Sequence, residues 1–230
     1  WSRSSSSISA IKGIDVFRIF DSLNWIENMK MPIEEALKTG KIVEGSLCYT
    51  GDILSPNEVK YTLDYYVEKA KELESLGVHI LADQGQAGLL KPTAAQKLVD
   101  DPQVRAPHPH PPAHPRHHRR GVATVLKAAE AGVDIADLAI ESMSSCTSQP
   151  SLNVVVEALR GTERDTGLDF EGWMSSAGTT STSARSTRPT RAAWSPPRQI
   201  YKYEIPGGQY SNLLAQVTEM GSKDEFEKIK

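Results

Sequence analysis

The stretch Ile14-Asp15-Val16-Phe17-Arg18-Ile19-Phe20 decides the fold class, because its β-branched and aromatic residues predict a buried strand. Runs of the same kind follow at residues 42–49, 78–82 and 133–140. They recur at roughly the spacing of successive βα units. This spacing indicates a parallel sheet.

The clearest helix is predicted to begin at Ser55, whose side chain suits an N-cap. Pro56 suits the first helical position, and Glu58 completes a capping box. Apolar residues recur with helical spacing from there to Gly77, which favours the left-handed conformation of a helix end. Further helices are expected at residues 93–99, 121–129 and 150–160.

The predicted fold class is α/β, and the hydrophobic strands suit a (β/α)8 TIM barrel better than an open sheet. Some segments contain too few core-forming residues to fold, so we expect a partial, incomplete barrel with disordered or irregular segments near 1–10, 101–120 and 172–199. The expected organisation is an irregular N-terminal segment (1–10), a barrel fragment (11–170, with an irregular insert at 101–120), a low-complexity segment (171–199) and the start of a following helical region (200–230).

The overall composition excludes several classes of protein. The 230 residues include 26 Lys and Arg against 29 Asp and Glu, a formal net charge of −3, so neither nucleic acid nor an anionic membrane is expected as a partner. No apolar run approaches the roughly 20 residues of a membrane-spanning helix. Cys48 and Cys146 are too few for a disulfide framework and too far apart for a CxxC zinc site. Without a secretory signal, a reducing compartment is expected.

Arg18 is the one cation inside a predicted apolar strand. Its guanidinium could bind a substrate carboxylate through two parallel hydrogen bonds. The alternative is a structural ion pair with Asp21 or Asp52, and the spacing alone favours that alternative. In a barrel, the chemistry belongs at the carboxyl ends of the strands, which is where these residues are expected.

Several longer strings stand in the chain in a fixed order: 13–24 (Gly-Ile-Asp-Val-Phe-Arg-Ile-Phe-Asp-Ser-Leu-Asn), 49–52 (Tyr-Thr-Gly-Asp), 87–92 (Ala-Gly-Leu-Leu-Lys-Pro), 141–151 (Glu-Ser-Met-Ser-Ser-Cys-Thr-Ser-Gln-Pro-Ser) and 204–213 (Glu-Ile-Pro-Gly-Gly-Gln-Tyr-Ser-Asn-Leu). Together they closely resemble the carboxyltransferase domain of pyruvate carboxylase. The resemblance covers most of residues 11–100, 121–170 and 200–230. Subunits of oxaloacetate decarboxylase and transcarboxylase are related to the same domain and form an alternative.

The resemblance implies a barrel that holds a divalent metal, Mn or Zn, in a biotin-dependent ligase that transfers carboxylate from carboxybiotin to pyruvate to give oxaloacetate. Arg18 falls at the arginine that binds pyruvate in the family, and this shifts the balance toward the binding role. Trp25 falls at an aromatic position near the biotin. The resemblance also implies a homotetrameric parent enzyme in the cytoplasm or, alternatively, in the mitochondrial matrix.

The metal ligands of the family do not occur at the corresponding positions. Its carboxylated lysine falls on Gln84, and its two histidines fall on Ala113 and Pro115. An amide cannot be carboxylated, and neither alanine nor proline has a side-chain donor atom. A threonine that relays a proton in the family would fall near Pro197. We therefore assign no metal ligand and no catalytic residue.

An out-of-frame translation accounts for the clustering of these losses. Codons for the family's Leu-His-Thr-His-Asp-Thr, read one base early, can encode the Ala-His-Pro-Arg-His that stands at residues 113–117. The hypothesis covers residues 83–86, about 101–120 and about 172–199, with sequencing error or gene decay as the origin. It leaves two functions: a carboxyltransferase-domain fragment that is inactive as written, or a non-catalytic, decayed fragment of a barrel.

Overall fold

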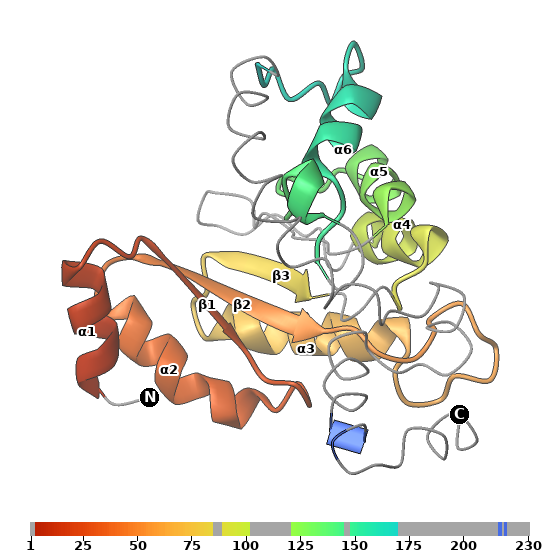
Figure 1. Ribbon diagram of the computed structural model, residues 1–230. Coiled ribbons are helices and arrows are strands. Elements are labelled where there is room, and N and C mark those ends of the chain that lie inside the picture. The colour runs from red at the N-terminus through yellow and green to blue at the C-terminus, as the bar shows by residue number, and fades with distance from the viewer. Residues whose placement is uncertain are drawn as a thin grey trace.

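Three parallel strands form the sheet of the protein, which is described by a computed structural model (Figure 1). They are β1 (Val16–Phe20), β2 (Ile42–Cys48) and β3 (Ile80–Gln84), in the order β1-β2-β3. The α/β class and the first three predicted strands are confirmed. A closed barrel is not established by this sheet and stays a prediction.

The structure describes residues 3–84, 89–101, 121–144, 148–169, 216, 217 and 219. The segment expected to be irregular at 172–199 lies outside these residues. So does the segment at 101–120 apart from Asp101, and most of the region at 200–230.

The helices are α1 (Arg3–Ile11), α2 (Ile26–Leu37), α3 (Leu63–Ser75), α4 (Pro92–Asp100), α5 (Val122–Glu130) and α6 (Leu152–Leu159), with a short 3-10 helix at Glu141–Met143. Helices α2 and α3 cover one face of the sheet (Figure 1). Ile33 and Ala36 of α2, Val43 of β2 and Leu73 of α3 are fully buried between these layers. The hydrophobic core of the described residues therefore lies on this face.

Gly45 in β2 lies close to Val78 and to Leu73 of α3. A Cβ atom at this position would lie 3.0 Å from Val78 Cγ1 and 3.3 Å from Leu73 Cδ1. A larger residue would push α3 away from the sheet, because these neighbours already fill the space.

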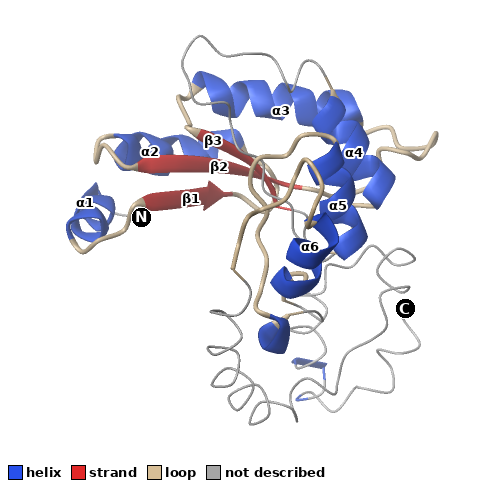
Figure 2. Ribbon diagram, turned by 90° about the horizontal axis from the view of Figure 1, so that it is seen from above, coloured by secondary structure: helices blue, strands red, loops and turns tan. Residues whose placement is uncertain are grey.

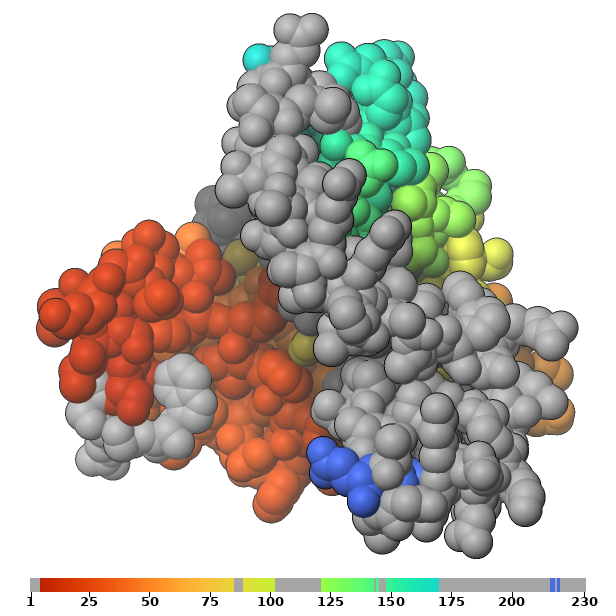
Figure 3. Space-filling view, viewed as in Figure 1, coloured from red at the N-terminus to blue at the C-terminus, as the bar shows by residue number. Residues whose placement is uncertain are grey.

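Helices α4, α5 and α6 pack on one another in chain order and lie toward the carboxyl ends of the strands (Figure 2). In the space-filling view, the N-terminal elements and the helices α5 and α6 occupy different parts of the visible face (Figure 3). No described helix combines the length and the apolar character that a membrane span requires.

The expectation of an irregular segment at residues 1–10 is wrong for the part that the structure describes, because Arg3–Ile11 forms α1. Serine is a weak helix former, but this helix packs against α2. Ser6 is 1% exposed, and Ala10 contacts the main core. Tertiary packing therefore stabilises a helix that local propensity does not favour.

The helix predicted from Ser55 begins later, at Leu63, with Thr62 as its N-cap. Thr62 Oγ1 accepts a hydrogen bond from the Tyr65 backbone N–H, as an N-cap side chain should. Glu58 does not act in a capping box but accepts the N–H groups of the next turn. The predicted end is confirmed, because Gly77 has φ of +83°.

Residues 133–140 do not form the predicted strand. Their one ladder contact among the described residues is the isolated bridge between Ala139 and Ser151. A strand persists when a neighbouring strand satisfies its backbone groups, and β3 is not paired with this segment in the described sheet. The segment instead places Asp137 over the sheet, where it contacts Arg18.

Candidate functional site

The two faces of the sheet differ in chemistry because side chains alternate along each strand. On β2, Val43 and Leu47 point into the helix-covered core. Glu44 belongs to the other face, where Arg18 of β1 lies opposite it in the register. Ser46 shares this face, and its hydroxyl donates to Glu44 Oε1 at 3.1 Å. The sheet therefore presents a charged, polar face opposite its apolar one.

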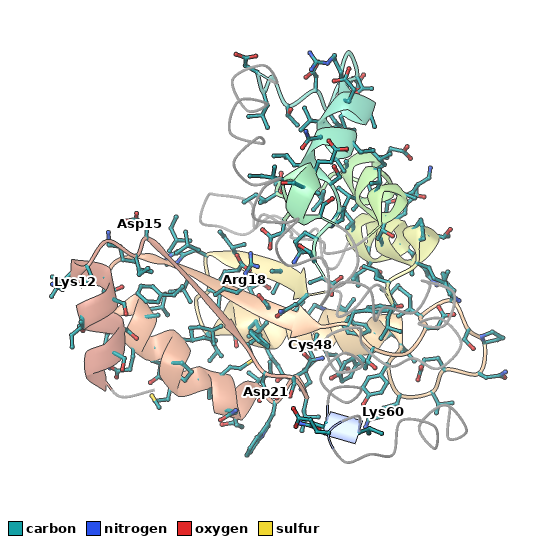
Figure 4. The ribbon with its side chains drawn as sticks, in the orientation of Figure 1. Lys12, Asp15, Arg18, Asp21, Cys48 and Lys60 are labelled. Carbon is teal, nitrogen blue, oxygen red and sulfur yellow. The ribbon has the colours of Figure 1, made fainter. Side chains whose placement is uncertain are left out.

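Arg18 is bound by two carboxylates on this polar face. Its Nε contacts Glu44 Oε1, and its Nη2 donates to Glu44 Oε2 at 3.3 Å. Its Nη1 donates to Asp137 Oδ2 at 2.5 Å, across 119 residues of chain. Figure 4 shows Arg18 on the side of the sheet away from α2, and Asp21 beyond the carboxyl end of β1.

The electrostatics of Arg18 follow from this geometry. Burial by itself would lower the pKa of the guanidinium, but the hydrogen bonds to Asp137 and Glu44, together with their negative charges, outweigh burial and raise the pKa of Arg18. The group is therefore a permanent cation. The ion pair considered from the sequence exists, but its partners are Glu44 and Asp137 rather than Asp21 or Asp52.

Asp21 holds the loop between β1 and α2. Its Oδ2 accepts the backbone N–H groups of Leu23 and Trp25, and its Oδ1 accepts the Asn28 amide at 2.9 Å. The pKa of Asp21 is lowered, chiefly by the Trp25 N–H and then by the Asn28 side chain, since both stabilise the ionised carboxylate. Trp25 precedes the first residue of α2 and is 62% exposed, so its indole ring is accessible to a ligand.

Asn24 joins this loop to β2. It is a buried residue with φ of +54°, and the structure contains no other non-glycine residue of positive φ among those described. Its Oδ1 accepts the Cys48 N–H at 2.7 Å, and its Nδ2 donates to the Cys48 carbonyl oxygen at 2.9 Å. The side chain thus pairs with the backbone of β2 at the point where the strand ends.

Tyrosines and Glu58 shape the loop after β2. Tyr66 Oη donates to the Thr50 carbonyl oxygen and accepts from the Thr50 N–H, both at 2.8 Å. Burial raises the pKa of Tyr66 far above its usual range, so the hydroxyl stays protonated. Glu58 Oε1 accepts the N–H groups of Lys60 and Tyr61 at 2.9 Å.

Asp52 connects this loop to the start of α4. Its Oδ2 accepts a hydrogen bond from Lys91 Nζ at 2.5 Å. Burial would raise the pKa of Asp52, but the hydrogen bond and the charge of Lys91 outweigh it and lower the pKa. The carboxyl end of β2 is therefore linked to the helix that follows β3.

A pocket of about 320 Å³ lies between β1 and α2. Arg18 and Phe20 form its strand side, and Asn28 and Met31 belong to its helix side. The Arg18 guanidinium lies on the side of the sheet away from α2, so this pocket and the cation are separate features of the site.

Gln84 does not fit the metal site that the family resemblance implies. It ends β3 on the polar face, opposite Cys48 in the register. Its Oε1 is buried and accepts no hydrogen bond from the described residues. Its amide nitrogen, unlike the amine of the family lysine, cannot be carboxylated to form a metal ligand. Within the described ranges, no group of three or more His, Cys, Asp or Glu side chains has the geometry of a metal site. The positions of the two family histidines, Ala113 and Pro115, lie outside those ranges.

Sequence reasoning identified Arg18 and missed its two partners. Glu44 is the lone acid of the strand predicted at 42–49, and parallel pairing with residues 14–20 would have placed it near Arg18. Asp137 gave a weaker signal, an acid inside the strand predicted at 133–140. Its approach to Arg18 depends on tertiary structure.

Comparisons with known proteins identify the family and agree with the fold class. The chain is 47% identical to the pyruvate carboxylase of Staphylococcus aureus over 227 residues, 43% identical to that of Bacillus subtilis over 226 residues, and 40% identical to the human mitochondrial pyruvate carboxylase over 227 residues. These alignments cover 95–96% of the chain. A family model described as a conserved carboxylase domain matches residues 200–230.

The chain belongs to the pyruvate carboxylase family, within its carboxyltransferase domain. It spans 19–20% of the length of these curated pyruvate carboxylases. The carboxyl transferase domain of Rhizobium etli pyruvate carboxylase superposes with a TM-score of 0.87 at 39% identity, covering 98% of this chain and 38% of that one. The same domain solved with pyruvate and biocytin gives a TM-score of 0.85 at 39% identity, with 96% and 38% covered.

Proposed function

We propose that the chain is part of a biotin-dependent carboxyltransferase, in which carboxylate passes from carboxybiotin to pyruvate, and that Arg18 binds the carboxylate of pyruvate. The observation that supports this is the fixed cation on the polar face of the sheet. A related carboxyl transferase domain has been solved with pyruvate. In this proposal the three strands are part of a (β/α)8 barrel.

Trp25 is proposed to contact biotin. Its exposed indole ring stands at the N-terminal end of α2, close in sequence to the strand that carries Arg18. An aromatic ring with one accessible face offers apolar contact to a ring-shaped ligand. The related domain solved with oxamate and biotin supports biotin as the ligand class.

The chain as written is proposed not to complete the transfer. The family resemblance requires a divalent metal, and Gln84 cannot supply the carboxylated ligand, so no step through a metal is assigned to these residues. An out-of-frame origin of residues 83–86 supports the same conclusion, and resequencing the gene across the three windows tests it. The alternatives are a decayed fragment without any function and a subunit of the related decarboxylase or transcarboxylase type.

The homotetrameric parent and the compartment, cytoplasm or mitochondrial matrix, stay predictions. One relative carries the description mitochondrial, and others are bacterial.

Ligand binding and turnover can be tested separately on the purified chain. Ligand-observed NMR with pyruvate or oxamate should show binding that is lost when Arg18→Gln and Glu44→Gln are combined, a pair that removes both charges together. Incubation with Mn²⁺ or Zn²⁺ should leave less than stoichiometric metal after gel filtration. The reverse transfer, in which carboxylate passes from oxaloacetate to free biotin and leaves pyruvate, is followed as the loss of oxaloacetate. Its rate should not exceed the rate measured without the protein.

If neither pyruvate nor oxamate binds to the wild-type chain, the proposed role of Arg18 is refuted. Stoichiometric tight metal, or turnover above background, would refute the proposed inactivity. The carboxyltransferase domain of a relative, measured in parallel, serves as the positive control.

A further inference from the structure

Two adjacent residues between β1 and α2 occupy positions that local stability does not favour. Asn24 has φ of +54°, a conformation that glycine adopts with less strain. Trp25 is the N-cap residue of α2, a position where serine, threonine, aspartate or asparagine would accept a backbone N–H. The Trp25 side chain makes no capping hydrogen bond. Departures from local preference gather at functional sites, so the two residues point to a functional role.

The side chain of Asn24 extends the pairing of the sheet. The backbone register of β1 with β2 ends at the pair Phe20 and Ser46, whereas β2 continues to Cys48. Asn24 Oδ1 accepts the Cys48 N–H at 2.7 Å, and Nδ2 donates to the Cys48 carbonyl oxygen at 2.9 Å. Nδ2 also lies 3.3 Å from Tyr65 Oη. Glycine would fit the positive φ but could not form these hydrogen bonds, so the position does more than turn the chain.

The backbone of Trp25 is held by Asp21 and Asn28. Asp21, which lies beyond the carboxyl end of β1 (Figure 4), accepts the Trp25 N–H through Oδ2 at 3.0 Å. The Asn28 N–H donates to the Trp25 carbonyl oxygen at 3.0 Å. Trp25 is nevertheless 62% exposed, whereas Asn24 is 4% exposed. The segment therefore has a fixed backbone and presents a large aromatic side chain to solvent.

We propose that Asn24 is a positioning residue, which ties the backbone of Trp25 to the end of β2 and so orients the indole ring for contact with biotin. This inference rests on the proposed contact between Trp25 and biotin. Asn24 itself does not bind the ligand, because its amide is paired with the backbone of Cys48. Its contribution is preorganisation, since a ring that is already oriented loses less conformational entropy when the ligand binds.

The first test is the Kd of free biotin for the full chain, measured by NMR titration under conditions in which each variant is folded by circular dichroism. Asn24→Gly accepts the positive φ but removes the pairing with Cys48, and it should raise the Kd about three- to tenfold. Ser151→Ala is the control. It removes the buried N-cap of α6, whose hydroxyl accepts the Val154 N–H, and should leave the Kd within about twofold.

The second test follows the motion of the indole ring without any ligand. The chain contains four tryptophans, and replacing Trp1, Trp173 and Trp194 by phenylalanine leaves Trp25 as the only one that fluoresces. In this background, Asn24→Gly should increase the fast part of the time-resolved anisotropy decay, which reports side-chain and loop motion in nanoseconds. A merely structural asparagine would lower the Tm and leave this decay unchanged in the folded state.

The outcomes separate the inference from the proposed function. If wild type does not bind biotin, or if Trp25→Ala binds it as tightly as wild type does, the proposed contact and the inference are both wrong. If Trp25→Ala weakens binding but Asn24→Gly keeps either the Kd or the anisotropy decay of wild type, the inference is wrong while the contact stands. Should Asn24→Gly not fold, Asn24→Asp takes its place, because it tolerates positive φ and loses the donor to the Cys48 carbonyl. It must then change both measurements in the same direction.

Discussion

Replacing Arg18 alone should destabilise the protein more than replacing Arg18 and Glu44 together. The Glu44 side chain is 1% exposed, and that of Arg18 is 26% exposed. Removing one partner of a buried ion pair costs about 3–5 kcal/mol, because the charge left behind has lost its hydration. Since water reaches part of Arg18, we expect a lower loss, about 2–3 kcal/mol, for Arg18→Gln.

The double variant Arg18→Gln with Glu44→Gln removes the buried Glu44 charge that the single variant leaves behind, and the Asp137 carboxylate that remains is 26% exposed and therefore partly hydrated. Two amides of similar size can still hydrogen-bond to each other, so we expect a loss of about 1 kcal/mol relative to wild type. The two single substitutions should therefore be non-additive by more than about 1.5 kcal/mol. In a chain of this length, about 2–3 kcal/mol corresponds to a fall in Tm of about 4–12 °C.

Urea unfolding, followed by circular dichroism and tryptophan fluorescence, measures each free energy. The denaturant slope m should stay unchanged if the folded state is preserved. Lys41→Gln is the control, because its ion pair with Asp15 is largely exposed and should be worth less than about 1 kcal/mol. Additive single losses, or a loss below about 0.5 kcal/mol for Arg18→Gln, would refute the reasoning.

Three further predictions concern the loops at the carboxyl end of the sheet. Asn24→Ala should lower the free energy of unfolding by about 1–3 kcal/mol, and Asn24→Gly by less, because glycine accepts φ of +54° without strain; equal losses in urea unfolding would contradict this. The lowered pKa of Asp21 means that its stabilisation is complete above the unfolded value of 3.8 and is lost as pH falls through the lower folded value. The stability gap to Asp21→Asn, measured by urea unfolding at each pH, should therefore be constant above about pH 5 and close toward pH 2, and a gap that widens in acid would be inconsistent. Gly51→Ala should lower the Tm more than the control Gly40→Ala. Both glycines have positive φ, but a Cβ atom at Gly51 would lie 2.3 Å from Glu58 Oε2, whereas one at Gly40 would meet open space. Equal falls in Tm would show that the Glu58 side chain moves aside freely.

Local sequence patterns predicted the elements whose stability is local. The apolar runs at 14–20 and 42–49 became β1 and β2 because each has a hydrophobic face that α2 and α3 can cover. Gly77 ended its helix as expected because the left-handed conformation is a property of one residue. Such patterns can be recognised without knowing which distant segments of the chain will pack against them.

The predictions that failed depend on tertiary contacts. The capping pattern at Ser55 predicted the helix start too early, because Glu58 is used by the backbone of its own turn. The serine-rich start of the chain became α1 because α2 provides a surface for it. Residues 133–140 have the composition of a strand but make no extended ladder in the described sheet. Composition cannot show whether a neighbouring strand is available.

The candidate site was predicted in the same uneven way. Arg18 was conspicuous as a cation within an apolar run, and the structure shows why it is tolerated there, since Glu44 lies opposite it. Asp137 could not be assigned as its partner, because 119 residues separate the two and no periodic pattern relates them. The family resemblance supplied a role for Arg18 but not the identity of the side chains that hold it.

The sequence separation between Arg18 and each of its two carboxylates also sets the order in which the ion pairs can form during synthesis on the ribosome. Glu44 follows Arg18 by 26 residues and Asp137 follows it by 119. At about 5–20 residues per second, the nascent chain meets Glu44 within about 1–5 s and Asp137 only after about 6–24 s. The growing polypeptide can therefore neutralise its cation with the nearer acid first and acquire the more distant one last. A stalled translation product that ends before residue 137 would contain the first of these pairs without the second.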